Sequence, residues 1–288
     1  MPEALALWRD FLVVAPQALD ILSPDKNLLL LDRRSGAIAA RIALPARQLS
    51  APVLDRDMAY LTASDGMLYA VDLATQRVAW RRDLGMGYSP FPPALDRTLL
   101  LLPANDPILR VFDLERQELV WSFSASRSAD GSLPSFMATP VVDSDLVLAS
   151  NWNGVLYALD RATGHERWHY LPKPPLRARP LVHSPVVAGD KVLVGSYDHC
   201  IHAVDRRNGT LCWISPDLGR RIHSRPIVVG SGSQAQIYVT PYCQFLYALH
   251  VENGQMAWPE AFALEGRGRC DLLLAGDRLV AGGHRAEV

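Results

Sequence analysis

Two histidines in the second half of the chain are the residues best suited to chemistry. His183 and His223 each precede a serine, in His183-Ser184-Pro185 and His223-Ser224-Arg225. Neutral imidazole can bind a metal ion or act as a general base. Two imidazoles brought together would therefore suit a metal site or a site that polarises a carbonyl. No third metal ligand follows at a recognisable spacing, so we assign no metal-binding or catalytic residue.

Positive charge gathers around the same two segments. Arg177 and Arg179 precede His183, Arg225 follows His223, and Tyr88 holds a comparable position earlier in the chain. Binding residues are often found on loops that a rigid scaffold positions. We therefore predict a binding surface for a ligand or partner that consists of Arg177, Arg179, His183, His223, Arg225 and Tyr88.

A repeated structural unit must position these loops. Its clearest sequence feature is an aspartate with a tryptophan eight residues later. The pairs are Asp72 and Trp80, Asp113 and Trp121, Asp160 and Trp168, and Asp205 and Trp213, with His250 and Trp258 as a variant and Asp32 and Ala40 as an incomplete first copy. We call the first residue of each pair the anchor of its repeat, and successive anchors lie 40 to 47 residues apart. This spacing is typical of the four-stranded blade of WD40-like propellers.

The amino-acid sequence between the anchors predicts four short strands in each repeat. Short apolar runs such as Leu146-Val147-Leu148 alternate with polar turns, and a proline such as Pro140 or Pro185 opens most repeats. Glycine stands four residues after four of the anchors, whereas Gln76 and Gln117 replace it in two repeats. Glycine at this point is typical of a tight turn with positive φ, because it has no Cβ to clash.

The strand pattern predicts an all-β, seven-bladed β-propeller whose last blade is incomplete. We count six complete repeats and part of a seventh from about residue 270, all within one domain of residues 1–288. A ring of six blades with an appended hairpin is the alternative.

Composition narrows the function. The chain is 49% hydrophobic and 20% charged, with a formal net charge of −1. Neutralising phosphates needs a basic surface, so we expect no nucleic-acid partner. No stretch approaches the ~20 apolar residues of a membrane helix, so we expect no membrane partner. The start of the chain lacks the basic and apolar segments of a signal peptide. If Met1 is the native start, we expect a cytoplasmic protein.

Two repeats carry a resemblance to a known family. The segments Ala158-Leu-Asp160-Arg-Ala-Thr-Gly164-His-Glu-Arg-Trp168 and Ala203-Val-Asp205-Arg-Arg-Asn-Gly209-Thr-Leu-Cys-Trp213 resemble the tryptophan-docking motif of quinoprotein alcohol dehydrogenase-like (PQQ-like) propellers. The resemblance implies that each tryptophan packs between adjacent blades. The chain also resembles the propeller lipoprotein of the bacterial barrel-assembly machine and the C-terminal propeller of aminoadipate-semialdehyde dehydrogenase-like acyl-activating proteins.

Three functions are compatible with this resemblance. The first is a non-catalytic scaffold that binds another protein or a carrier-linked substrate, and it is the function we predict. The second is a small-molecule or metal site in the central funnel. The third is a dehydrogenase that uses pyrroloquinoline quinone and Ca²⁺. The dehydrogenases of the family are longer, and many have adjacent cysteines, whereas no two of the four cysteines here are adjacent. We therefore expect no cofactor.

Overall fold

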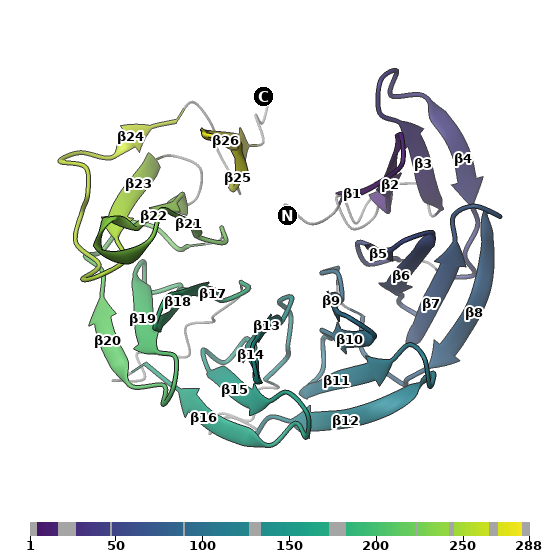
Figure 1. Cartoon of the computed structure of the whole chain (residues 1–288), viewed down its shortest axis with the longest axis horizontal. Helices are drawn as coiled ribbons and strands as arrows, with labels where there is room; N and C mark the ends of the chain where they lie inside the picture. The colour runs from purple at the N-terminus through teal and green to yellow at the C-terminus, as the bar shows by residue number, and fades with distance from the viewer. Residues whose placement is uncertain are drawn as a thin grey trace. The chain divides into compact units, whose positions relative to one another are not determined.

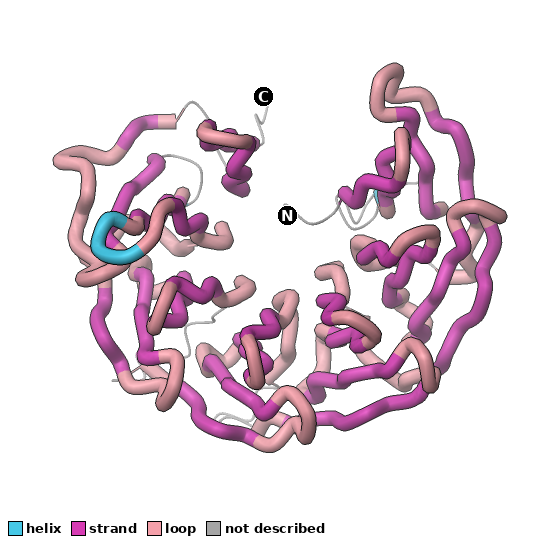
Figure 2. The backbone as a smooth tube through the Cα atoms, in the orientation of Figure 1, coloured by secondary structure: helices cyan, strands magenta, loops and turns pink. Residues whose placement is uncertain are grey.

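Strands and turns make up nearly all of the described chain. The structure, a computed structural model, describes residues 5–16, 27–46, 48–88, 90–126, 134–172, 183–222, 224–241, 245–264 and 270–283. A single turn of 3-10 helix, η1 (Gly232–Gln234), interrupts the strands of one sheet and is drawn in cyan in Figure 2. The prediction of an all-β protein is confirmed. The chain divides into two compact units, Met1–Pro140 and Val141–Val288.

In the first unit the described residues form three antiparallel sheets of four strands, and in each the strands pair in chain order (Figure 1). The first sheet comprises β1 (Leu5–Trp8), β2 (Phe11–Val14), β3 (Leu28–Asp32) and β4 (Ile38–Ile42). The second comprises β5 (Val53–Asp55), β6 (Met58–Thr62), β7 (Met67–Asp72) and β8 (Arg77–Asp83). The third comprises β9 (Ala94–Asp96), β10 (Leu99–Leu102), β11 (Ile108–Asp113) and β12 (Glu118–Ser124).

The described residues of the second unit form three more four-stranded sheets and one hairpin. The first sheet is β13 (Val141–Asp143), β14 (Leu146–Ser150), β15 (Leu156–Asp160) and β16 (Glu166–Tyr170). The second is β17 (Val186–Ala188), β18 (Lys191–Gly195), β19 (Ile201–Asp205) and β20 (Leu211–Ile214). The third is β21 (Ile227–Val229), β22 (Gln236–Val239), β23 (Phe245–His250) and β24 (Phe262–Ala263), and the hairpin is β25 (Cys270–Ala275) and β26 (Arg278–Gly283).

Within each unit, successive sheets adjoin through their first strands. In the first unit β1 contacts β5 and β5 contacts β9; in the second unit β17 contacts β21 and β21 contacts β25. The second and third strands of the sheets are the most buried, as the all-buried pattern of β14 illustrates. Apolar side chains from neighbouring sheets therefore meet in shared cores. One such core joins Leu148 and Ala158 to Val192 and Val204 of the next sheet.

Each repeat aspartate holds the turn that follows it. In the fourth repeat Asp160 Oδ1 accepts hydrogen bonds from the N–H groups of Ala162 and Thr163, at 3.0 and 2.9 Å. The same pair of bonds forms at the other four aspartates, Asp32, Asp72, Asp113 and Asp205. A short acidic side chain that binds its own turn is an Asx-turn. The aspartates are therefore structural residues.

The predicted turn conformation is confirmed at the glycine position. Gly36, Gly164, Gly209 and Gly254 have φ between 71° and 73°. Gln76 and Gln117, which replace glycine in two repeats, adopt the same region with φ of 58° and 55°. Side chains with a Cβ reach this region at a cost of about 1–2 kcal/mol. The turn geometry is thus retained in these two repeats despite the strain.

Three repeat tryptophans contact the sheet that follows their own. The Trp80 ring packs against Phe112 of the next sheet, with centroids 5.8 Å apart, and Trp168 and Trp213 form hydrogen bonds. The indole Nε1 of Trp168 donates to the Arg206 carbonyl at 3.1 Å, and that of Trp213 donates to the Val251 carbonyl at 3.1 Å. Both acceptors come one residue after the next anchor. The rings of Trp168 and Trp213 also lie over the next turn glycine: a Cβ placed on Gly209 would come within 2.5 Å of Trp168. The glycine therefore serves two purposes, the positive φ and the space for the ring.

The sixth repeat departs from the predicted pattern. Trp258 lies in a bend outside the fourth strand, which is shortened to β24. Pro259 follows it and has no N–H to donate to a neighbouring strand. The ring of Trp258 packs edge-on against Tyr238 of its own sheet, with centroids 5.6 Å apart.

Among the described residues, no helix has the length and apolar character needed to cross a membrane.

Candidate functional site

The six predicted binding residues fall into three groups. Arg177, Arg179 and His223 lie outside the described residues, so their roles stay predictions. Tyr88 belongs to the first unit. His183 and Arg225 belong to the second unit, where both are half-buried and each already has an interaction within the chain.

The hydroxyl group of Tyr88 has a structural partner. It donates a hydrogen bond to the Leu49 carbonyl at 3.1 Å. Burial raises the pKa of the Tyr88 phenol to about 12. The side chain is therefore neutral near pH 7, and its hydrogen bond joins two loops of the first unit.

His183 marks the place where two loops of the second unit meet. Its carbonyl accepts a hydrogen bond of 2.7 Å from the Ser150 hydroxyl, at the end of β14. The segment before β17 is thereby joined to the loop that connects β14 and β15. That loop carries a residue that our sequence reasoning had not selected, Trp152.

Trp152, Tyr197 and Arg221 form what we term the aromatic–basic cluster. The Trp152 ring packs edge-on against Tyr197, with centroids 6.3 Å apart and an interplanar angle of 72°. The Arg221 guanidinium lies over the Tyr197 ring, 5.1 Å from its centroid. Trp152 is 45% exposed, although tryptophan is an apolar residue. The only sequence signal was that Trp152 is one of two tryptophans outside the repeat position.

Hydrogen bonds define the loop that carries Tyr197. The Ser196 N–H donates to the Cys200 carbonyl, and the Ser196 hydroxyl accepts from the Asp198 N–H. Asp198 Oδ1 accepts from the Cys200 N–H at 3.1 Å. His199 adopts a positive φ of 76°, which this tight turn requires. Tyr197 is therefore presented by a turn whose backbone is held on both sides.

A buried histidine is hydrogen-bonded to the same loop. His202 is 1% exposed, and its ring lies between the Asp198 carboxylate and the Tyr170 hydroxyl, each 2.8 Å away. Burial by itself raises the pKa of Asp198, but hydrogen bonds from His202, Ser196 and Cys200 and the charge of His202 bring the pKa below its usual value. Asp198 is therefore ionised near neutral pH and ties the loop to β19. The buried His202 ring thus links Asp198 of the loop to Tyr170 through hydrogen bonds, and these bonds orient the loop.

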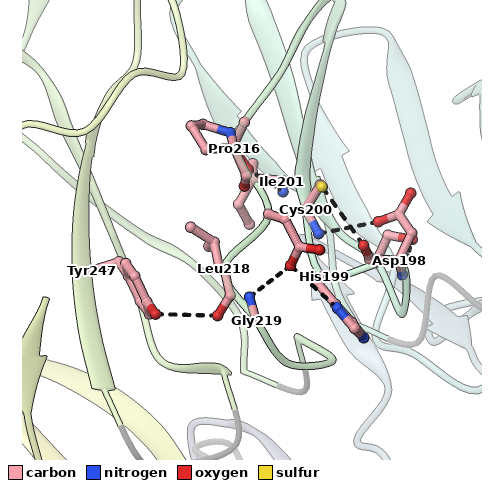
Figure 3. A network of polar contacts seen from close by, with 11 residues as sticks. Asp198, His199, Cys200, Ile201, Pro216, Leu218, Gly219 and Tyr247 are labelled. Atoms are coloured by element: carbon pink, nitrogen blue, oxygen red, sulfur yellow. Dashed lines mark hydrogen bonds and ion pairs between the residues drawn. The ribbon is translucent and has the colours of Figure 1, made fainter.

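The connection from β20 to β21 is bonded to the same loop and brings Arg221 to Tyr197. Figure 3 shows the Leu218 carbonyl accepting from the Tyr247 hydroxyl, and His199 beside the carboxylate that also binds the Gly219 N–H. That carboxylate belongs to Asp217. The Ile222 N–H donates to the Ser196 carbonyl at 3.2 Å, directly after Arg221. The loop between β18 and β19 and the connection that leaves the same sheet are therefore joined by hydrogen bonds, and they carry Tyr197 and Arg221.

A cleft lies elsewhere in the second unit. It has a volume of about 450 Å³ and is bordered by the Asp190–Lys191 ion pair, the loop of residues 230–233 and Glu252. Neither His183 nor Arg225 is among the described residues that line it. Across the described ranges, no three His, Cys, Asp or Glu side chains are grouped so that they could hold a metal ion.

Comparisons with solved structures identify the fold. BamB from Moraxella catarrhalis has a TM-score of 0.75 and 20% identity, over 97% of this chain and 79% of that chain. The computationally designed Ika8 protein has a TM-score of 0.73 and 12% identity, over 98% and 80%. Quinohemoprotein alcohol dehydrogenase from Comamonas testosteroni has a TM-score of 0.60 and 17% identity, over 74% of this chain and 42% of that one. The fold is therefore the BamB-like propeller fold.

Sequence comparison shows the family. A comparison with curated proteins gives no match. Residues 9–169, more than half of the chain, match the family described as outer membrane protein assembly factor BamB. This match covers most of the first four repeats, including the motif that ends at Trp168. On the repeats, the fold and this match together, the chain belongs to the family of the outer membrane protein assembly factor BamB.

Proposed function

We propose that this chain is a protein-interaction scaffold that meets its partner through the aromatic–basic cluster. The family supports a role in protein assembly, because its name describes an assembly factor for outer membrane proteins. The cluster supports a particular surface. Tryptophan, tyrosine and arginine are the residues that dominate binding energy in protein interfaces, and here one of each makes a continuous contact.

The observation that carries the proposal is the exposure of Trp152 on a rigid support. An exposed indole on a mobile loop would lose conformational entropy on binding, which weakens affinity. Trp152 instead packs against Tyr197, whose loop is held by Asp198, His202 and the connection to β21. A partner that covers the ring therefore gains apolar burial at a small ordering cost.

The repeats supply that rigidity. We propose that they close as a seven-bladed propeller with an incomplete last blade, in which β25 and β26 are the first two strands. The pairing of strands in chain order within every sheet and the contact between β21 and β25 support this arrangement. We also propose that the repeat tryptophans fix each blade to the next, as the Trp168 and Trp213 hydrogen bonds suggest.

Site-specific photocrosslinking in the native host tests the scaffold proposal. A photoreactive phenylalanine analogue replaces Trp152 in one variant and Phe262 in a control variant. Phe262 is 62% exposed and lies on β24 of the same unit. We expect a discrete adduct with one partner protein from position 152 and none from position 262. Adducts of equal yield at both positions, or at neither, would contradict the proposal.

A further inference from the structure

We infer that the aromatic–basic cluster recognises an extended acidic segment of a partner protein. In this arrangement a carboxylate of the segment contacts Arg221, and an apolar side chain beside it covers Trp152. This inference rests on the proposed scaffold function and adds the chemistry of the partner to it.

The charges around the cluster favour a carboxylate. The two acidic side chains nearby already have partners: Asp198 binds His202, and Asp217 lies 3.2 Å from the His199 imidazole. Arg220 and Arg221 are both exposed. Among the described residues no carboxylate lies within ion-pair distance of either guanidinium. The two arginines therefore provide positive charge at this surface that a carboxylate of a partner can pair with.

The position of Arg221 over Tyr197 favours a planar acceptor. Its guanidinium lies over the Tyr197 ring, with its central carbon 5.1 Å from the ring centroid. Stacking uses the flat face of a guanidinium and leaves the N–H groups along its edge for hydrogen bonds. Those edge donors match the two oxygens of a carboxylate. Lysine at this position would keep the charge but lose both the stacking and the paired donors.

A protein segment fits these features better than a nucleic acid does. Binding to a phosphate backbone depends on many cationic contacts, whereas this chain has a net charge of −1 and the surface offers two exposed arginines, Arg221 of the cluster and the adjacent Arg220. One or two carboxylates are sufficient for these guanidiniums. The exposed Trp152 ring accounts for the apolar neighbour.

Fluorescence anisotropy with the full chain tests the inference. The probes are three labelled peptides of equal length in which Phe and Leu alternate with Asp, Asn or Lys, together with an oligouridine. We expect the Asp peptide to bind at least tenfold more tightly than the Asn peptide, because a charge-assisted bond is about twice as strong as a neutral one. The Lys peptide and the oligouridine should bind more weakly than the Asp peptide.

Variants of the chain separate the cluster from general charge. Arg221→Gln and Trp152→Ala should each weaken binding of the Asp peptide by about tenfold or more, and Arg221→Lys should have an intermediate effect. Arg207→Gln changes an exposed arginine in a hairpin turn of the same unit and should leave binding unchanged. Circular dichroism before each titration shows whether the variant is folded.

The outcomes are distinguishable. Equal binding of the Asp and Asn peptides, no binding of the Asp peptide, or unchanged binding by Arg221→Gln would overturn the inference. Tighter binding of the oligouridine would assign the surface to nucleic acid and would also overturn it. If crosslinking at position 152 still captures one partner while the peptides fail, the scaffold function stands and the acidic preference is wrong.

Discussion

Gly209→Ala should destabilise the protein far more than Gly36→Ala does. Both glycines have a φ of +71°, and each N–H donates to the carbonyl of its anchor aspartate at 2.8 Å. They differ in their surroundings. A Cβ on Gly36 would meet nothing within 4 Å, whereas a Cβ on Gly209 would lie 2.5 Å from the Trp168 ring.

The magnitude follows from two contributions. A Cβ in the left-handed region costs about 1–2 kcal/mol at either site. At Gly209 the Trp168 ring must also move, and overpacking of this kind costs about 1–3 kcal/mol. We therefore expect Gly36→Ala to lower the free energy of unfolding by about 1–2 kcal/mol and Gly209→Ala by about 2–5 kcal/mol.

Urea unfolding followed by far-ultraviolet circular dichroism measures both changes. Native-state hydrogen exchange then locates them, since amides of β16 and β19 should lose protection only in Gly209→Ala. A double-mutant cycle with Trp168→Ala completes the assay, because removing the ring should abolish the overpacking and make the two changes non-additive. Equal losses at Gly36 and Gly209, or strict additivity with Trp168→Ala, would refute the assigned contact between ring and glycine.

Three further predictions concern single side chains. Gln76→Gly should stabilise the protein by roughly 0.5–1 kcal/mol, because glycine relieves the positive φ of 58° at some entropic cost in the unfolded chain; a lower urea midpoint would contradict this. The depressed pKa of Asp198 stabilises the fold above the unfolded value of about 3.9 and ceases to do so as pH falls through the folded value. Amide protection in the loop of residues 196–200 should therefore decrease in acid, and Asp198→Asn should reduce that pH dependence; an unchanged profile would exclude the role of Asp198. Burial, followed by the charge of Asp198, raises the pKa of Tyr170 to about 12. The contribution of the neutral Tyr170 side chain to the free energy of unfolding is therefore fully present below the unfolded pKa of about 10 and is lost as pH rises through about 12. Absorbance titration of tyrosinate should show one fewer late-titrating group in Tyr170→Phe, and an identical curve would disprove the assignment.

The repeat positions were predictable because their chemistry is local. An aspartate that binds its own turn and a glycine four residues later act within a few residues, so the spacing in the sequence was enough to predict both the hairpin and the sign of φ. Trp258 shows the limit of that reasoning. It keeps the repeat spacing, but Pro259 has no N–H with which to continue the strand, and Trp258 lies in a bend outside the fourth strand.

The aromatic–basic cluster was not predictable in the same way. Trp152, Tyr197 and Arg221 lie on connections from two repeats, and only tertiary hydrogen bonds such as Ile222 to Ser196 bring them together. The sequence pattern placed the binding surface on His183 and Arg225, which precede two of the first strands. The bond between Ser150 and the His183 carbonyl shows that one of these segments is attached to the loop that carries Trp152.

The placement of tryptophan and glycine has a consequence for how such chains gain and lose repeats. The fifth repeat carries both halves of a joint: Gly209 receives the ring of the preceding repeat, and Trp213 reaches the following one. A gene segment that encodes both halves can be duplicated next to itself, and the new repeat will have a compatible neighbour on each side, because the Trp168 and Trp213 contacts each join adjacent repeats. The number of repeats can therefore change during evolution by whole repeats, because each added repeat uses the same tryptophan–glycine interface.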